Sequence, residues 1–253
     1  MSDDPRARLR QHLRQRVEMG ERALFLRDVS ALRWLETLEH GFPPDTTSVA
    51  AATPARTHED DPFEALRAEA LACTRCALCE GRTHVVFGEG DRHADLLVVG
   101  EAPGREEDRT GRPFVGAAGK LLDTLLLSAG FRRDEVYICN VLKCRPPQNR
   151  DPDPSEIATC RPYLNGQIEH IGPKLVVAFG RFAAQTLLGT EASLGRLRGV
   201  EHDLHGVPVV VTYHPAALLR KPEWTRAVWE DLQRLRRAYE RVGGRAPRGA
   251  LGG

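Results

Sequence analysis

The sequence predicts an α/β protein in which a parallel sheet lies between layers of helices. Short, continuous apolar runs recur along the chain, and such runs are typical of strands that are buried on both faces. Segments with helical spacing alternate with these runs, which indicates parallel strands joined by crossover helices. The 253 residues fit one sizeable domain with appendages, or two small domains.

The order of these segments defines a main domain at residues 62–242. The apolar runs predict strands at residues 96–99, 136–141, 175–179 and 207–212. The helical spacing predicts helices at residues 63–72, 117–129, 154–171, 181–188 and 223–241.

The segments outside the main domain have different compositions. Residues 1–40 predict a helical N-terminal extension, because apolar residues recur at helical spacing from Leu9 to Val17 and from Leu32 to Leu38. We interpret it as an appendage that packs on the main domain or on a protein partner, with a DNA-binding arm as the weaker alternative. Residues 41–61 predict a linker, and residues 243–253 a disordered tail.

The composition is that of an ordinary soluble globular protein, with 41% hydrophobic and 28% charged residues. No apolar run approaches the roughly 20 residues that span a bilayer, and the N-terminus lacks the apolar core of a signal peptide. We therefore expect a cytoplasmic protein that does not bind membranes. The net charge of +1 argues neither for nor against nucleic-acid binding, because a protein of low net charge can carry a local basic patch.

Polar residues follow three of the four predicted strands. Glu101 comes after the first strand, Asn140 ends the second, and His214 follows the fourth. Ligands of open α/β sheets bind beyond the carboxyl ends of the strands, so these side chains are expected to meet at one rim. Each residue type alone is often structural, as Asn is in turns. Their shared location favours a functional site.

The six cysteines are Cys73, Cys76, Cys79, Cys139, Cys144 and Cys160. A reducing cytoplasm disfavours disulfides, so clustered cysteines indicate metal or redox chemistry. The pair at C-x-x-C spacing together with Cys144 and Cys160 could hold zinc or an iron–sulfur cluster. The spacing does not distinguish zinc from an iron–sulfur cluster. It also does not identify the four ligands, because Cys79 extends the C-x-x-C pair to a C-x-x-C-x-x-C run. Cys139 lies within an apolar strand and is expected to be a small buried hydrophobe.

Several motifs in this order closely resemble the family 4 (type-4, iron–sulfur) uracil-DNA glycosylases. They are GEAPG at 100–104 with ED at 107–108, TGRPFVG at 110–116, NVLKCRPPQNR at 140–150 and HPA at 214–216, with RT at 82–83 and VVFGEG at 85–90 in the same pattern. The resemblance runs from about residue 71 to about residue 235 and leaves out residues 1–60.

The resemblance implies a three-layer αβα fold with a central four-stranded, mainly parallel sheet. It also implies an enzyme that flips uracil out of DNA and hydrolyses its N-glycosidic bond, leaving an abasic site in base excision repair. The expected partner is uracil-containing DNA, single- or double-stranded, and the expected state is a monomer.

The resemblance also implies a [4Fe–4S] cluster whose ligands are Cys73, Cys76, Cys144 and Cys160. Its role in the family is structural, and here it would clamp the proline-rich loop between the last two ligands to the N-terminal segment. Cys79 and Cys139 are then spare.

Four residues are expected to bind the base. Phe114 would stack on it, and the amide of Asn140 would donate to O4 and accept from N3–H of uracil, a pattern that cytosine reverses. His214 would hydrogen-bond O2 as negative charge develops on the leaving base. The backbone of Ala102 would also contact uracil, although many relatives carry Gly at that position.

Glu101 and Glu107 are the catalytic carboxylate candidates. One would orient the attacking water, and one would stabilise the cationic sugar by its charge. Glu101 is favoured for the pocket, because Glu107 and Asp108 could instead cap or brace the loop.

DNA contacts are expected from an apolar wedge and from several cations. Leu219 would fill the gap that the flipped base leaves. The phosphate contacts are assigned to Arg112, Lys143, Arg145, Arg220 and Lys221. The alternative for any one of these cations is a solvated surface charge.

Three other functions are weaker interpretations. A related group traps uracil-DNA covalently through a histidine in an inserted loop, but residues 143–150 contain no histidine. A non-enzymatic DNA-binding module would not need a carboxylate, an aromatic ring, an amide and an imidazole together. A redox carrier is disfavoured, because the ferredoxin-like Cys followed by Pro is absent from the run of cysteines that contains Cys79.

Overall fold

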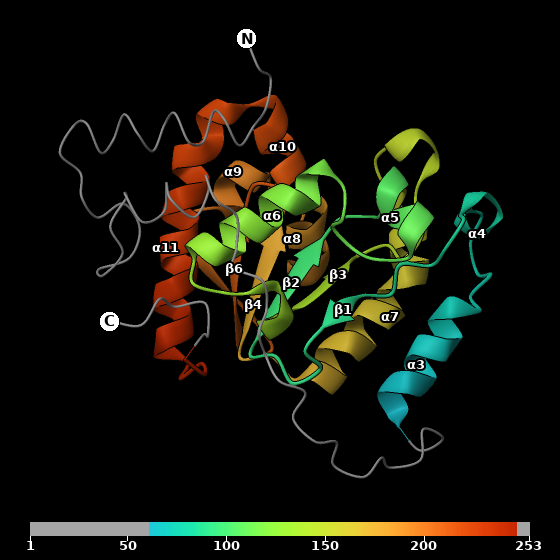
Figure 1. Cartoon of the computed structure of the whole chain (residues 1–253), viewed down its shortest axis with the longest axis horizontal. Helices are drawn as coiled ribbons and strands as arrows, with labels where there is room; N and C mark the ends of the chain where they lie inside the picture. The colour runs from blue at the N-terminus through green and yellow to red at the C-terminus, as the bar shows by residue number, and fades with distance from the viewer. Residues whose placement is uncertain (1–60, 247–253) are drawn as a thin grey trace, which may run out of the picture. The chain divides into compact units, whose positions relative to one another are not determined.

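The computed structural model describes residues 61–246 (Figure 1). The expected helical extension at residues 1–40 and nearly all of the linker lie outside the described residues. The described residues from Pro62 onwards form one compact unit. No helix in residues 61–246 is long and apolar enough to cross a membrane.

A six-stranded sheet lies at the centre of this unit (Figure 1). Its strands are β1 (Glu89–Gly90), β2 (Leu96–Gly100), β3 (Tyr137–Asn140), β4 (Leu175–Phe179), β5 (Glu201–Leu204) and β6 (Val207–Thr212), in the spatial order β1-β3-β2-β4-β6-β5. The four inner strands are mutually parallel, and β1 and β5 pair antiparallel at the two edges. The α/β class with a mainly parallel sheet is confirmed.

The sheet has six strands instead of the expected four. The inner four coincide with the predicted apolar runs. The two additional strands lack such a run, since β1 has two residues and β5 has the sequence EHDL with alternating exposure. Polar, short edge strands are common because they discourage pairing with another sheet.

Helices cover both faces of the sheet. On one face, Leu97 and Val99 of β2 belong to a core that also contains buried residues of α3 (Pro62–Leu71), α7 (Pro154–Ile171) and α8 (Arg181–Leu188). On the other face, Leu96 and Val98 pack with α6 (Ala117–Ser128) and α11 (Thr225–Arg241). Alternate residues of a strand point to opposite faces, so the continuous apolar run serves both cores.

Local chemistry fixes the limits of the long helices. α7 begins after Asp153, whose carboxylate accepts from Ser155 N–H at 2.8 Å, and it ends at Gly172 in the left-handed conformation. The predicted helix at 223–241 begins at Thr225, after a 3₁₀ turn at Pro222–Trp224.

Several short helices lacked a recognisable helical period in the sequence. They are α4 (Leu78–Gly81), α5 (Arg105–Thr110), α9 (Leu194–Leu197) and α10 (Pro215–Arg220), with further 3₁₀ turns at Arg133–Glu135 and Pro147–Asn149. α5 follows β2 and α10 follows β6, so both lie where the chain leaves the carboxyl ends of the parallel strands.

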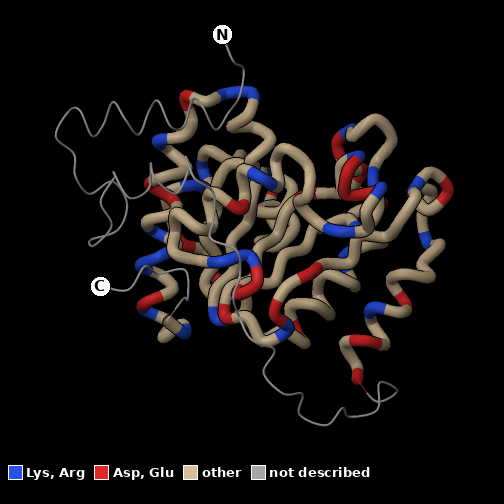
Figure 2. Tube along the Cα trace, in the orientation of Figure 1, with Lys and Arg blue, Asp and Glu red and all other residues tan. Residues whose placement is uncertain are grey.

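The first residues of the expected disordered tail are in contact with the domain. The backbone N–H of Arg245 donates to Asp95 Oδ2 at 2.8 Å, so the fold extends beyond residue 242. Positions of acidic and basic residues are interspersed along the chain trace (Figure 2).

Candidate active site

A pocket of about 330 Å³ opens where the segments after β2, β3 and β6 meet. This volume lies within the roughly 300–1,000 Å³ of ligand sites. The structure brings the predicted Glu101, Ala102, Phe114, Asn140 and His214 into this one lining. The remaining lining residues are Pro103, Gly104, Glu107, Ala118, Pro146, Asn149, Arg150, Asp151, Ala216 and Arg220.

Asn140 ends β3 opposite Gly100 of β2 and is 1% exposed. Its Oδ1 is buried and has no hydrogen-bond partner. A Cβ atom on residue 100 would lie 2.3 Å from this oxygen and 2.4 Å from Cζ of Phe114. Glycine at position 100 therefore leaves room for an amide and a ring, and the amide presents an unpaired acceptor.

Phe114 forms a wall of the pocket from a strained backbone position. Its φ is +50°, a region that costs non-glycine residues roughly 1–2 kcal/mol. Its ring stacks on that of His214, with centroids 5.5 Å apart and planes at 29°. Gly119 permits this turn, because a Cβ on Gly119 would lie 1.8 Å from the carbonyl oxygen of Phe114.

His214 caps the N-terminus of α10 and is oriented by that helix. Its Nδ1 accepts the backbone N–H of Ala216 at 3.2 Å, so the ring proton of the neutral form resides on Nε2. Burial, assisted by the positive charge of Arg220, lowers the pKa of His214 to about 4. The imidazole is therefore a neutral N–H donor at physiological pH.

Glu101 follows β2 and is the carboxylate with a perturbed pKa in the pocket. Burial and the nearby negative charge of Asp151 raise the pKa of Glu101 to about 7, against the opposing charges of Arg181 and Arg220. Arg181 pairs with Asp151 at 2.9 Å. The protonation of Glu101 therefore changes near neutral pH, where a general base is most effective.

Glu107 also lines the pocket, but its carboxylate is bound to the backbone. Oε1 accepts from the N–H groups of Val115 and Gly116, both at 2.8 Å, and Oε2 accepts from Gly104 at 3.1 Å. Asp108 similarly accepts from Thr83 N–H at 2.8 Å. The geometry favours the bracing role for Glu107 over a direct catalytic one.

The comparison with known proteins gives one consistent family. Residues 87–233 match the model described as the uracil DNA glycosylase superfamily. A type-4 uracil-DNA glycosylase of Archaeoglobus fulgidus is 45% identical over 175 residues, which cover 66% of this chain and 88% of that protein. The corresponding protein of Thermotoga maritima is 47% identical, with 68% and 91% covered.

The chain belongs to the uracil DNA glycosylase superfamily. The resemblance to type-4 members is thus confirmed. A type-5 uracil-DNA glycosylase of Pyrobaculum aerophilum is also similar, at 36% identity over 148 residues, 51% of this chain and 64% of that protein.

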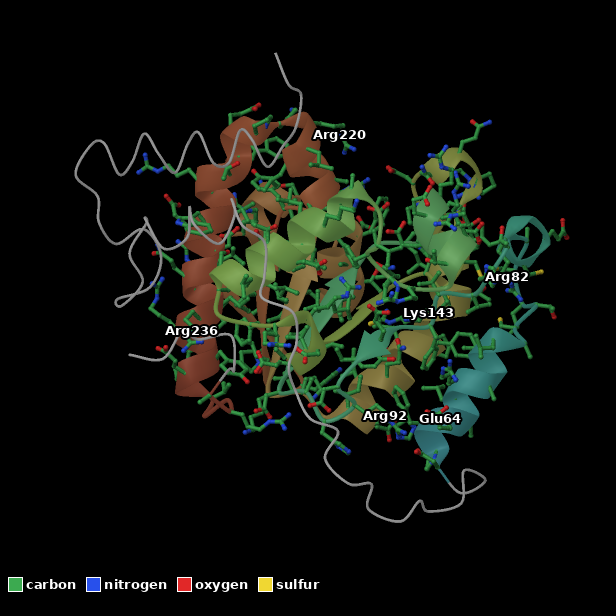
Figure 3. All side chains as sticks on the ribbon, in the orientation of Figure 1. Glu64, Arg82, Arg92, Lys143, Arg220 and Arg236 are labelled. Atoms are coloured by element: carbon green, nitrogen blue, oxygen red, sulfur yellow. The ribbon has the colours of Figure 1, made fainter. Side chains whose placement is uncertain are left out.

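Lys143 is buried in the interior of this glycosylase-family protein. The predicted contact between Lys143 and a DNA phosphate is therefore wrong. The residue is 1% exposed. Its Nζ donates to the carbonyl oxygen of Asn140 at 2.6 Å and to Oε1 of Gln167 at 2.5 Å. Lys143 therefore supports the end of β3 from within, whereas Arg220 lies at the outer end of α10 (Figure 3).

The other expected DNA contacts are distributed around the rim. Arg220 is exposed and lines the pocket, and Leu219 precedes it, half-buried, on α10. Arg112 is largely exposed but pairs with Glu89 at 2.7 Å. Nε of the half-buried Arg145 donates to an exposed Asn149 at 2.8 Å. Lys221 is also exposed and lies over the ring of Trp224.

Five cysteines line one small cavity between α3, α4 and α7. Cys73, Cys76, Cys79, Cys144 and Cys160 all contribute to it. Cys139 is buried in β3, as expected. Among residues 61–246, no three His, Cys, Asp or Glu side chains have the spacing that would hold a single metal ion. The cavity instead gathers thiols from segments far apart in the sequence.

Two donors already point at the sulfur atoms. Nη1 of Arg82 lies 3.3 Å from Sγ of Cys144, and the backbone N–H of Lys143 lies 3.3 Å from Sγ of Cys160. Hydrogen bonds to sulfur are typical of sites that bind iron–sulfur clusters, where they tune the cluster. The donor set and its surroundings therefore fit an all-thiolate cluster.

Some pocket residues carried no role in the sequence interpretation. Asn149, Arg150 and Asp151 line the pocket from the loop after β3. The guanidinium of Arg150 pairs with Glu156 at 2.6 Å. The signal available was the end of the 140–150 motif, which placed two of the three residues beside the predicted site.

Proposed function

We propose that this protein is a uracil-DNA glycosylase that extrudes uracil from DNA and hydrolyses its N-glycosidic bond, leaving an abasic site for base excision repair. The observation that carries the proposal is the buried, unpaired amide oxygen of Asn140 at the end of the pocket. The names of the relatives, which are type-4 uracil-DNA glycosylases, agree with this activity.

Base recognition assigns a donor and an acceptor to Asn140. Its Oδ1 accepts from N3–H of uracil, and its Nδ2 donates to O4. Cytosine has an acceptor at N3 and a donor at N4, so it would leave both groups of the amide unpaired. Because the amide is buried, water cannot satisfy it in that complex, and cytosine is rejected.

Leaving-group stabilisation falls to His214. The Nε2–H of the neutral ring remains available as a donor, since Nδ1 accepts from Ala216 and His214 lines the pocket. A preorganised donor strengthens its interaction with O2 as the C1′–N1 bond breaks and negative charge moves onto the base. One face of the Phe114 ring stacks against this imidazole, and the plane of uracil would stack on its other face.

Glu101 supplies the carboxylate of the reaction. In its ionised form it orients and deprotonates the water that attacks C1′, and its charge stabilises the cationic sugar. Glu107 contributes indirectly, because its bonds to backbone N–H groups hold the turn that carries Phe114.

A [4Fe–4S] cluster on Cys73, Cys76, Cys144 and Cys160 completes the proposed fold. The supporting observations are their common cavity and the two donors that face sulfur. The bound cluster would supply a covalent tie between the start of the domain and the loop after β3. Cys79 shares the cavity and remains the spare thiol in this assignment.

Uracil-containing DNA, single- or double-stranded, would bind across the pocket mouth. Arg220 and Arg112 are exposed cations suited to phosphate oxygens, and Leu219 is the proposed wedge. We further propose a monomer that acts in the cytoplasm, with a protein partner for the N-terminal segment as a separate hypothesis.

A cleavage assay tests the activity. A labelled oligonucleotide carrying one uracil opposite G, opposite A or unpaired is incubated with the protein and then treated with alkali. Strand breaks that appear only after alkali, with thymine and cytosine oligonucleotides intact, are expected of a monofunctional glycosylase. Intact uracil strands from protein with a full iron content would make this chain a uracil-DNA binder or an inactive relative of the family.

A further inference from the structure

Two oppositely charged side chains hold the backbone of the Phe114 turn. The carbonyl oxygen of Phe114 accepts from Nη1 of Arg133 at 3.2 Å, and that of Pro113 accepts from Nη2 at 2.5 Å. The next N–H group, of Val115, donates to Glu107 at 2.8 Å. The peptide after Phe114 is thus bound at its oxygen by a cation and at its nitrogen by an anion.

All three nitrogen atoms of the Arg133 guanidinium donate hydrogen bonds. Its Nε donates to Glu89 at 2.8 Å and its Nη1 to Asp123 at 2.7 Å, while the other contacts go to the two carbonyl groups. The side chain is 23% exposed. A guanidinium has five N–H donors in a rigid fork, whereas a lysine ammonium is a point charge with three. Lysine therefore could not reproduce all four contacts.

The Phe114 turn needs this support. The residue has a left-handed backbone with φ of +50°, and its ring must remain parallel to His214. Strained conformations of this kind persist only where the surrounding structure over-determines them. Without the cation, the carbonyl groups of Pro113 and Phe114 would lose their hydrogen bonds to Arg133, and Glu107 would hold the turn only through its backbone N–H groups. We expect the ring to be less firmly fixed in the pocket wall.

We propose that Arg133 is a positioning residue for base recognition, which sets the ring of Phe114 by fixing its peptide. The proposal rests on the proposed function, since it assumes that uracil stacks on Phe114. Arg133 lies in the 3₁₀ turn before β3, outside the motifs shared with the family, and it does not line the pocket. It acts through the backbone of another residue.

A double-mutant cycle tests the proposal. The variants are Arg133→Gln, Phe114→Ala and the double substitution. The readouts are the inhibition constant of free uracil and the single-turnover cleavage of a uracil oligonucleotide. Arg133→Gln should weaken uracil inhibition on the order of tenfold, the equivalent of about 1.4 kcal/mol. It should cause no further loss in the Phe114→Ala background, because coupled residues are non-additive.

The neighbouring Arg132 provides a matched control. Its guanidinium pairs with Asp134 at 3.1 Å, and none of its hydrogen bonds within residues 61–246 goes to the Phe114 turn. Arg132→Gln therefore removes the same charge and should leave uracil inhibition unchanged. Arg133→Lys keeps the positive charge between Glu89 and Asp123 and should give a smaller loss than the glutamine variant. It replaces that variant in the cycle if thermal melting shows the latter to be unfolded.

The possible failures are distinguishable. If Phe114→Ala leaves uracil inhibition and cleavage unchanged, the proposed stacking role of Phe114 is wrong. If Phe114→Ala weakens both readouts but the Arg133 variants do not, only the positioning role is lost. An equal loss from Arg133→Gln in the wild-type and Phe114→Ala backgrounds would show that Arg133 acts elsewhere.

Discussion

The amide oxygen of Asn140 is buried and has no hydrogen-bond donor among the described residues. Leaving such a group unpaired costs about 1–3 kcal/mol. A ligand with a matching N–H removes this cost, and a ligand without one does not. The residue therefore provides both affinity for the right base and discrimination against the wrong one.

Asn140→Asp tests this role at the level of a single atom. An aspartate has no amide donor and would place a charge in the buried position, so kcat/KM on uracil should fall at least about 100-fold. Cleavage of uracil and cytosine oligonucleotides would be measured in parallel. Asn165 is exposed on α7, and Asn165→Asp is the control that should retain full activity. Unchanged kinetics in the Asn140 variant would exclude it as the edge reader.

Glu101 should set the acid limb of the pH–rate profile. Its pKa of about 7 means that the ionised form increases as the pH rises through neutrality, and cleavage should rise with it. His214, with a pKa of about 4, stays neutral over that range. Glu101→Gln should remove the limb near pH 7 and lower the rate about 100- to 10,000-fold. A limb that survives in this variant would assign it to another group.

The same substitution should stabilise the fold at high pH. The pKa of Glu101 is raised from the usual 4.5, so its burial favours the protonated form. Stability from this group is present below pH 4.5 and is lost as the pH rises through about 7. Glu101→Gln should therefore raise the free energy of unfolding by about 1–3 kcal/mol at pH 8 and change it little at pH 4. Thermal melting at the two pH values would check the sign.

The loop between β3 and α7 serves two sites. Its first part carries Cys144 of the cysteine cavity, and its next residues, Pro146 and 149–151, line the pocket. Gln148 and Asn149 both have left-handed backbones, with φ of 56° and 54°. Since the loop has only a 3₁₀ turn of its own, its conformation depends on what binds its ends.

Cys144→Ala should therefore affect colour, stability and the pocket together. We expect loss of the visible absorbance and iron of the purified protein, a lower folded yield and weaker cleavage. Cys79→Ala is the matched control, because Cys79 lines the same cavity but is assigned as spare. It should keep iron and absorbance. Retention of both by Cys144→Ala, or their loss in Cys79→Ala, would overturn the ligand assignment.

Sequence patterns predicted the inner elements better than their edges. The continuous apolar runs identified the four parallel strands, because burial on both faces leaves a strong signal. β5 carries charges and alternates in exposure, so it had no comparable signal. Lys143 was misread because its burial depends on Gln167 of α7, a contact between residues far apart in the chain. Glu101, Asn140 and His214 were predicted to lie close together because each is at or just after the end of a strand, and all three line the pocket.

The whole chain contains more than the glycosylase fold. The family match spans residues 87–233, and the described part of the compact unit spans residues 62–246. All residues that line the pocket and the cysteine cavity lie within that unit. The proposed catalytic residues and cluster ligands therefore all lie among the described residues 61–246.

Deletion of residues 1–58 should leave uracil cleavage intact. All of the proposed pocket residues and cluster ligands remain in the shortened chain, so kcat/KM and iron content should match those of the full-length protein. Both proteins would be assayed on the same uracil oligonucleotide at several salt concentrations. Loss of activity at every salt concentration would show that the N-terminal segment is part of the DNA site and that the domain boundary is wrong.

The absence of a side chain at Gly100 predicts the genetic effect of a mutation at this position. Any β-carbon there would overlap the amide of Asn140 and the ring of Phe114, so even the alanine codon is expected to be a null allele. The substitution would leave the surface residues unchanged, and its effect would fall on the pocket. A lineage carrying it would be recognised by its mutation spectrum, because deaminated cytosines left in place are copied as thymine and accumulate as C-to-T transitions.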